Sequence, residues 1–175
     1  MRNFVPQTMQ TTHDTDHIAR RLNLPPAPLR LRRGPKGVEV HDPIRSKWLV
    51  LTPEEWVRQH FVCYLTTDRQ VPRTMVANEM GITLNSTSKR CDTVIYAPDL
   101  RPVAIVEYKA PSVRITREVF DQIVRYNIVL KVRYLIVSNG LSHYCCRVDY
   151  EGARCSFIEG IPTYPEMLAD RSQTT

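Results

Sequence analysis

Two nearby segments, residues 90–97 and 103–110, are apolar at most positions. Strands that are apolar on both faces are typical of the interior of a sheet that is covered on each side. Only the tetrapeptide Pro98–Arg101 separates the two segments, so they are expected to form an antiparallel hairpin. The rest of the chain must therefore supply layers that cover both faces of this hairpin.

The surrounding sequence supplies helices and further strands. Thr52, Pro53 and Glu55 form a capping box, which predicts a helix that begins here and runs to about Thr66. A second helix is expected over residues 116–130, and other extended segments are expected at 74–80, 82–84, 133–138, 142–150 and 154–158. This order predicts an α/β fold with a central mixed β-sheet flanked by helices.

The length of 175 residues is typical of one domain. Residues 1–24 are polar and aperiodic, and we expect a flexible tail there. Residues 25–165 are expected to form the folded domain, and residues 166–175 a C-terminal tail. Short strands at 29–33, 38–41 and 47–51, with a Gly-Pro-Lys-Gly turn between the first two, predict an N-terminal β-element.

Positive charge is concentrated in this N-terminal part. The net charge of the chain is +6, and residues 1–50 contain nine basic against four acidic side chains. A basic strand element can follow the phosphates of a nucleic acid. The alternative is a solubilising charge pattern on edge strands. The candidate nucleic-acid-binding residues are Arg30, Arg32, Arg33, Lys36, Arg45 and Lys47.

The cysteines and the apolar segments bear on the compartment. The five cysteines form an odd set without a Cys-x-x-Cys pair, which argues against a disulfide framework and against a zinc site. The sequence has no recognisable signal peptide and no apolar segment long enough to cross a membrane. A cytoplasmic protein without a membrane partner is therefore expected.

Charged side chains at the end of the second apolar strand indicate a functional site. Glu107 and Lys109 alternate with Tyr108 and should project to the same side. If Tyr96 pairs with Val103, Asp92 lies opposite Glu107. Two opposed carboxylates repel unless a cation lies between them, and oxygen ligands favour Mg²⁺. The alternatives are an ion cluster at the rim of the sheet and a chance register.

The second helix carries two unusual polar residues. Gln122 and Tyr126 lie one turn apart within the apolar stripe that should pack on the sheet. A buried amide and a buried phenol need hydrogen-bond partners. Gln122 is therefore placed to reach a metal-bound water or a phosphate oxygen, and the alternative is a core amide satisfied by backbone groups.

The ordered set of these residues resembles a known family. Cys91-Asp92, Glu107-Tyr108-Lys109 and Gln122-x-x-x-Tyr126 resemble the PD-(D/E)xK nuclease core, and Cys91 stands where the name-giving proline would be. More closely, the chain is similar to the N-terminal endonuclease domain of type I restriction enzyme R subunits, in a stand-alone form. The segments that carry this likeness are Leu51-Thr-Pro-Glu-Glu, Val106-Glu-Tyr-Lys-Ala-Pro, Phe120-Asp-Gln-Ile-Val-Arg-Tyr-Asn and Ser138-Asn-Gly.

The resemblance implies a restriction-endonuclease-like core and a Mg²⁺-dependent DNA endonuclease, with Mn²⁺ as a substitute metal. Asp92 and Glu107 would bind the metal, and Lys109 would serve the attacking water. Gln122 and Tyr126 would complete the catalytic set. The family often adds a glutamate from the first helix.

In this chain that glutamate would be Glu55 or Glu54. Glu55 has the capping box as an alternative role. Glu79 is a further candidate, with a solvent-facing position as its alternative.

The sequence contains no G-x-x-x-x-G-K-[ST] motif, so a motor or a specificity subunit would have to be a separate partner.

Two alternatives to a DNA-cutting enzyme stay open. The first is a catalytically inactive nuclease-fold module that binds nucleic acid or a partner protein. The second is a purely structural ion cluster.

Overall fold

The computed structural model describes residues 20–84 and 86–170, which form two β-sheets and three α-helices. The small sheet contains β1 (Leu31–Gly34), β2 (Gly37–Asp42) and β3 (Lys47–Val50). The large sheet contains β4 (Val76–Leu84), β5 (Thr87–Tyr96), β6 (Pro102–Tyr108), β7 (Tyr134–Ser138), β8 (His143–Asp149) and β9 (Arg154–Ile158). The helices are α1 (Pro53–Thr67), α2 (Arg117–Leu130) and α3 (Tyr164–Ala169), and a 3-10 turn covers Arg73–Met75.

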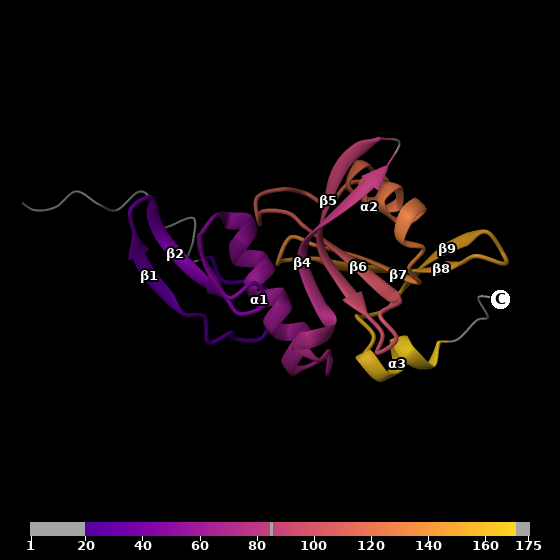
Figure 1. The fold of residues 1–175 in the computed structure, drawn as a ribbon, viewed down its shortest axis with the longest axis horizontal. Helices are drawn as coiled ribbons and strands as arrows, with labels where there is room; N and C mark the ends of the chain where they lie inside the picture. The colour runs from indigo at the N-terminus through magenta and orange to yellow at the C-terminus, as the bar shows by residue number, and fades with distance from the viewer. Residues whose placement is uncertain (1–19, 85, 171–175) are drawn as a thin grey trace, which may run out of the picture.

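The large sheet is mixed, as the sequence predicts. Its strand order is β4-β5-β6-β7-β8-β9, and every neighbouring pair is antiparallel except β6 and β7. These two parallel strands are connected through α2, because parallel neighbours need a crossover segment between them. The α/β fold with a central mixed sheet flanked by helices is therefore confirmed (Figure 1).

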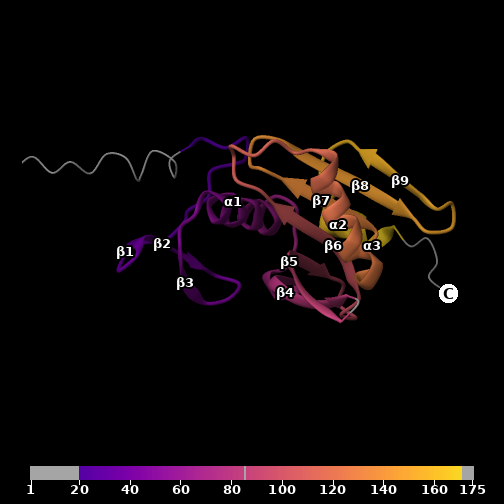
Figure 2. The same ribbon diagram turned by 90° about the horizontal axis from the view of Figure 1, so that it is seen from above.

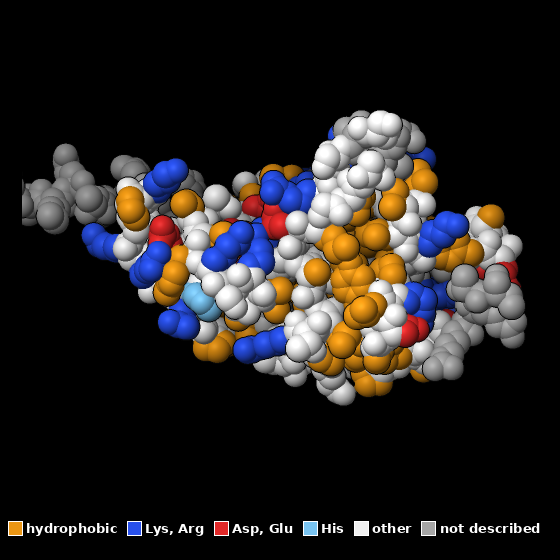
Figure 3. Space-filling view, in the orientation of Figure 1, with side chains coloured by type: hydrophobic (Ala, Val, Ile, Leu, Met, Phe, Trp, Pro, Cys, Tyr) orange, Lys and Arg blue, Asp and Glu red, His pale blue; other side chains and the backbone are white. Residues whose placement is uncertain are grey.

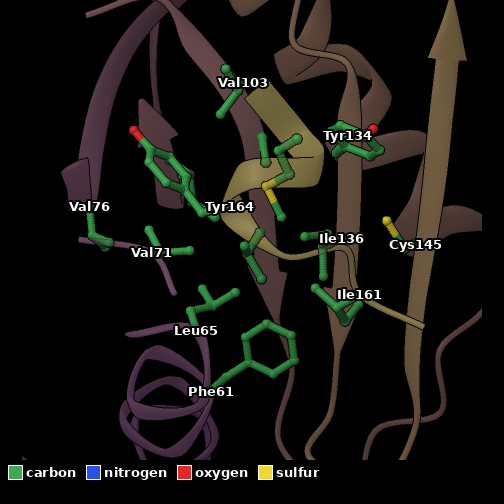
Figure 4. Packing of buried hydrophobic residues seen from close by; sticks show 14 of the residues in the cluster. Phe61, Leu65, Val71, Val76, Val103, Tyr134, Ile136, Cys145, Ile161 and Tyr164 are labelled. Atoms are coloured by element: carbon green, nitrogen blue, oxygen red, sulfur yellow. The ribbon is translucent and has the colours of Figure 1, made fainter. Parts of the chain in front are cut away.

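Helices cover both faces of the large sheet because β6 is apolar on both sides. Ala104, Val106 and Tyr108 pack in one cluster with residues of α1 and α3, whereas Ile105 packs in a second cluster with residues of α2. Figure 2 shows α1 and α2 as separate layers. Figure 4 shows Phe61 of α1 within the first cluster. The chain thus brings α1 and α2 to opposite sides of the same central strand.

The small sheet is an antiparallel meander that lies beside α1 (Figure 1). Its three strands and the Gly34–Gly37 turn agree with the sequence prediction. Val40 and Asp42 of β2 are fully buried. Asp42 also accepts a hydrogen bond from the side chain of Asn78 in β4, which ties the small sheet to the large one.

Two details of the large sheet differ from the sequence expectation. Ile95 pairs with Ala104, but a register shift then pairs Tyr96 with Pro102, so the expected Tyr96–Val103 pair was wrong. Residues 76–84 of the two expected segments at 74–80 and 82–84 form the single strand β4, whereas Thr74 and Met75 lie in the 3-10 turn. The strand continues past Glu79 although that residue has a positive φ of 58°. A local irregularity at one residue can leave the flanking pairs intact.

Contacts extend beyond the boundaries expected at residues 25 and 165. Leu22 is buried, and the backbone of Asn23 bonds to Gly140. Met167 of α3 is buried as well. The rest of the two expected tails, residues 1–19 and 171–175, lies outside the described residues. No helix within the described ranges is long and apolar enough to cross a membrane.

Asp170, directly after α3, supports a prediction about acid stability. Its carboxylate accepts hydrogen bonds from Arg147 Nη2 at 2.6 Å, from Arg147 Nε at 2.7 Å and from the Tyr134 hydroxyl at 2.7 Å. These bonds hold the pKa of Asp170 at about 2, below its usual 3.8. The resulting stability is present above pH 4 and is lost as the pH falls toward 2.

We therefore expect Asp170→Asn to lower the free energy of unfolding at pH 7 by about 1 kcal/mol, because the half-exposed Arg147 is partly screened by solvent. The variant should also lose less stability than the wild type between pH 4 and pH 2. Urea denaturation across this pH range measures both effects. Glu151→Gln, in the exposed turn between β8 and β9, is the control and should behave as wild type.

Candidate active site

The paired acids lie where the hairpin of β5 and β6 ends. The ladder ends with the pair of Thr93 and Val106, so Asp92 and Glu107 occupy the next positions on the two strands. Asp92 Oδ2 accepts a hydrogen bond of 2.8 Å from the backbone N–H of Tyr108. The local register is the one that the sequence predicts for these two acids, in spite of the shift at Tyr96.

Glu107 anchors a polar cluster on the side of the sheet that α2 covers. Its Oε1 accepts hydrogen bonds from Lys109 Nζ at 2.8 Å and from the Gln122 amide nitrogen at 2.7 Å. The same Gln122 nitrogen lies 3.1 Å from the Tyr126 hydroxyl, and Gln122 Oε1 lies 3.3 Å from Lys109 Nζ. The expected proximity of Gln122 and Tyr126 to the Glu-x-Lys strand is thus present in the fold, because one turn of α2 faces the end of β6.

Burial changes the acidity of this cluster. The Glu107 side chain is only 4% exposed. Burial, and next the nearby charge of Asp92, raise the pKa of Glu107 to about 7. Burial lowers the pKa of Lys109, but its hydrogen bond to Glu107 and the charge of that carboxylate outweigh this effect and raise it. The cluster therefore favours a cation next to Glu107.

Arg58 of α1 is the centre of a second, adjoining cluster. Its Nη2 lies 2.7 Å from Asp92 Oδ1 and 2.8 Å from Glu79 Oε1. Its Nη1 lies 2.5 Å from Glu55 Oε2, and Glu54 Oε1 is 3.9 Å from Nη2. The Arg58 side chain is 6% exposed. One buried guanidinium thus contacts four carboxylates, one of them the candidate metal ligand Asp92.

Glu55 takes only half of the predicted capping box. The Thr52 hydroxyl accepts a hydrogen bond of 3.0 Å from the Glu55 backbone N–H, which confirms the helix start. The Glu55 carboxylate instead accepts hydrogen bonds from Arg58, from Gln59 at 2.7 Å and from Arg45 at 3.1 Å. Glu55 and Asp92 therefore contact the same arginine, Arg58.

The other two candidate glutamates also lie next to Arg58. Glu54 is 44% exposed, and burial together with the charge of Asp92 raises its pKa. Glu79 of β4 lies opposite Asp92 of β5. The residues on either side show this register, since Asn78 pairs with Thr93 and Met80 pairs with Cys91. The left-handed backbone of Glu79 turns its carboxylate to Arg58 and Arg90.

The described donors fit a hard divalent cation, although they do not form a dedicated cage. No group of three or more His, Cys, Asp or Glu side chains in residues 20–84 and 86–170 is arranged to hold a metal. Mg²⁺ is commonly held by only one or two carboxylates, with waters and phosphate oxygens as its other ligands. The buried Glu107 Oε2 has no hydrogen-bond partner among the described residues, which leaves one carboxylate oxygen for a cation.

The candidate nucleic-acid-binding residues do not form one face. Arg30 and Arg32 lie over the Trp48 ring, with guanidinium carbons 5.6 Å and 4.3 Å from its centroid. By strand alternation Arg33 and Lys47 are on the opposite face of the small sheet, and Lys36 is in the β1–β2 turn. Blue side chains are accordingly spread over this end of the molecule in Figure 3.

Arg45 lies apart from these basic residues. It forms ion pairs with Asp42 and Glu55, and its side chain is 14% exposed. It therefore connects the small sheet to the Arg58 cluster rather than extending the exposed basic surface.

Arg58 is the site residue that sequence reasoning missed. The signal was present, because Arg58 follows Glu54 by four residues and Glu55 by three, the spacings at which helical side chains meet. Its contacts to Glu79 and Asp92 span large sequence separations and follow only from the packing of α1 near the β4–β5 hairpin.

The Glu107–Lys109 pair supports a prediction that can be tested without metal. Lys109→Met leaves a buried carboxylate without its cation, so we expect it to lower the free energy of unfolding at pH 8 by about 1–3 kcal/mol. In a double-mutant cycle with Glu107→Gln, the coupling energy should be favourable at pH 8. It should shrink as the pH falls through about 7, because Glu107 then takes up a proton. Urea denaturation of the four proteins measures the cycle, and a coupling energy that is equal at pH 8 and pH 5.5 would contradict the assigned acidity of Glu107.

Comparisons with known proteins agree with this architecture. The family described as type I restriction enzyme R protein N terminus (HSDR_N) matches residues 53–162, which is more than half of the chain. A solved fragment described as an HsdR subunit of a type I restriction enzyme from Vibrio vulnificus YJ016 has the same fold, with a TM-score of 0.51 and 18% identity. The match covers 68% of this chain and 25% of that one. A search of curated protein sequences found no match. On the strength of the family match, and in agreement with the fold, the chain belongs to the family of type I restriction enzyme R protein N-terminal domains.

Proposed function

We propose that this protein is a Mg²⁺-dependent DNA endonuclease that hydrolyses phosphodiester bonds. The observation that carries the proposal is the juxtaposition of Asp92 and Glu107 at the end of one hairpin, with Lys109 Nζ 2.8 Å from Glu107 Oε1. Two carboxylates and an ammonium at the end of two neighbouring strands suit the binding of a divalent cation beside a phosphate. Membership of the type I restriction enzyme R protein family supports DNA as the substrate.

Each residue of the cluster has a proposed task. Asp92 and Glu107 would hold the cation, and Mn²⁺ would substitute for Mg²⁺. When bound, such a cation stabilises the developing charge on the phosphate and acidifies a water molecule. Lys109 would orient the attacking water through an N–H donor. The Gln122 amide would fix the Lys109 ammonium and the Glu107 carboxylate. The Tyr126 hydroxyl would in turn hold the Gln122 amide.

The exposed basic residues of the small sheet would contact the DNA backbone. Arg30 and Arg32 lie on one face, where the Trp48 ring supports both guanidinium groups. Phosphate contacts of this kind position a protein on DNA without reading its sequence. The chain covers 25% of the HsdR fragment that it matches, and a motor or a specificity subunit is proposed as a partner.

One observation favours a second candidate function. Arg58 contacts Asp92 Oδ1 at 2.7 Å, so the described structure places an arginine beside one of the two expected metal ligands. A protein in which this arginine stays in place would bind DNA or a partner protein and would not cut. This non-catalytic module makes the opposite prediction for the cleavage experiment below.

Nicking of supercoiled plasmid DNA in the presence of Mg²⁺ or Mn²⁺ tests the proposed reaction. We expect Asp92→Ala and Lys109→Ala each to lower the nicking rate by at least about 100-fold, because they remove a metal ligand and the group that orients the water. Tyr126→Phe should cost less than about tenfold, since it removes only the support of Gln122. Asp99→Ala, at an exposed turn, is the matched control and should cut as the wild type does.

Nicking that survives Asp92→Ala and Lys109→Ala would overturn the assignment of the active site. DNA binding by the wild type without metal-dependent nicking would favour the non-catalytic module.

The salt dependence of DNA binding tests the proposed role of the small sheet. Each lost phosphate contact lowers the slope of log K against log salt by about 0.9. We expect a variant with Arg30→Gln, Arg32→Gln and Lys36→Gln to bind duplex DNA more weakly and with a smaller slope. Fluorescence anisotropy at several salt concentrations measures both, and an unchanged slope would exclude these residues from the interface. Arg154→Gln, at the far end of the large sheet and 77% exposed, is the control.

A further inference from the structure

Arg58 occupies the Asp92 side of the candidate active site. Both oxygens of Asp92 are engaged, because Oδ1 contacts Arg58 Nη2 at 2.7 Å and Oδ2 accepts the Tyr108 N–H at 2.8 Å. Glu107 differs, since its Oε2 has no hydrogen-bond partner among the described residues. A cation that binds both acids would therefore find Glu107 available and Asp92 already paired.

The guanidinium is held in place from two directions. Glu55 contacts Arg58 Nη1 at 2.5 Å and is itself fixed by Arg45 and by Gln59. The Arg58 guanidinium also lies 5.6 Å from the centre of the Tyr108 ring. These contacts and the 6% exposure of its side chain show that Arg58 is a built part of the site rather than a surface residue that happens to lie nearby.

A divalent cation and this guanidinium cannot share Asp92 without repulsion. Two positive charges about 4 Å apart near a protein surface repel by several kcal/mol, which is enough to weaken cation binding by more than tenfold. The Arg58 guanidinium therefore competes with a divalent cation for the Asp92 carboxylate.

The surrounding carboxylates offer the guanidinium a second position. Nη2 already lies 2.8 Å from Glu79 Oε1, and the half-exposed Glu54 lies only 3.9 Å away. A small rotation of the side chain would exchange the contact to Asp92 for closer contacts to Glu79 and Glu54. Arg58 would then remain paired, so its charge would not be left buried without a partner.

We propose that Arg58 is a positioning residue that pairs with Asp92 in the metal-free protein and moves onto Glu79 and Glu54 when a divalent cation binds. Its competition for Asp92 sets the metal affinity of the site. This inference rests on the proposed function, because it takes Asp92 and Glu107 as the ligands of the cation.

Calorimetric titration of the full chain with MnCl₂, in the absence of DNA, tests the proposal. Arg58→Gln and Arg58→Met remove the competing charge, so we expect each to lower the Kd for Mn²⁺ at least about tenfold. Arg58→Lys retains the positive charge that repels the cation, so its Kd for Mn²⁺ should stay within about threefold of that of the wild type. Arg101→Gln is the control, because it removes a positive charge from a side chain that is 52% exposed at the opposite end of the β5–β6 hairpin, and its Kd should be that of the wild type.

The rise in Tm that added MnCl₂ produces is a second readout, because the loss of a merely structural arginine would leave that rise unchanged. Arg58→Gln should have a lower Tm than the wild type without metal, because the carboxylates lose their common cation. Added MnCl₂ should then raise the Tm of Arg58→Gln more than that of the wild type. Glutamine retains hydrogen-bond donors for Glu55 and Asp92, so this variant carries the test if Arg58→Met does not fold.

An equal or higher Kd for Arg58→Gln than for the wild type would overturn the inference, and so would equal tightening by Arg58→Lys and Arg58→Gln. The nicking rates would still decide the proposed function in those cases. Tighter Mn²⁺ binding by Arg58→Gln in a protein that never nicks DNA would support the inference and contradict the nuclease. Absence of Mn²⁺ binding by every variant would overturn both.

Discussion

The structure depends on the burial of a carboxylate at the end of a central, otherwise apolar strand. Glu107 is 4% exposed, and burial raises its pKa to about 7. A buried charge of this kind is costly unless it is paired and hydrogen-bonded. Lys109 supplies the charge, Gln122 supplies the hydrogen bond, and α2 must lie over this end of β6 for Gln122 to reach. This requirement explains the polar residues in the otherwise apolar buried stripe of α2.

A chain of alternating charges connects the small sheet to the site. Asp42 of β2 pairs with Arg45, Arg45 with Glu55, Glu55 with Arg58, and Arg58 with Asp92. The five side chains of this series of ion pairs range from fully buried to 14% exposed. Solvent therefore screens these ion pairs much less than it screens ion pairs on the surface. Removal of one member would leave its neighbours with an uncompensated charge. The small sheet is thus a structural support of the site as well as a basic surface, and α1 is the element through which the two are joined.

Much of the site could be predicted because its determinants are local. The alternation along β6 puts Glu107 and Lys109 on one side, and the helical spacing puts Gln122 next to Tyr126. The hairpin connection then determines that Asp92 lies near Glu107, and the shift at Tyr96 does not disturb this because it occurs at the other end of the ladder. The sequence groups Arg45 with exposed basic residues, whereas its contacts with Asp42 and Glu55 depend on how the small sheet meets α1.

By itself the sequence determined the mixed α/β fold, the family of the chain and the set of residues that gather around Glu107. These follow from apolar strands, caps and turn residues that act over a few neighbouring positions. Only the tertiary structure decided that Arg58 lies among Glu54, Glu55, Glu79 and Asp92. Its contact with Asp92 joins residues that are 34 positions apart. The contact forms because α1 packs beside the β4–β5 hairpin, and this packing brings the guanidinium to the end of β5 where Asp92 lies. Electrostatic pairing over such separations is determined by where the layers pack, and local sequence patterns do not encode it.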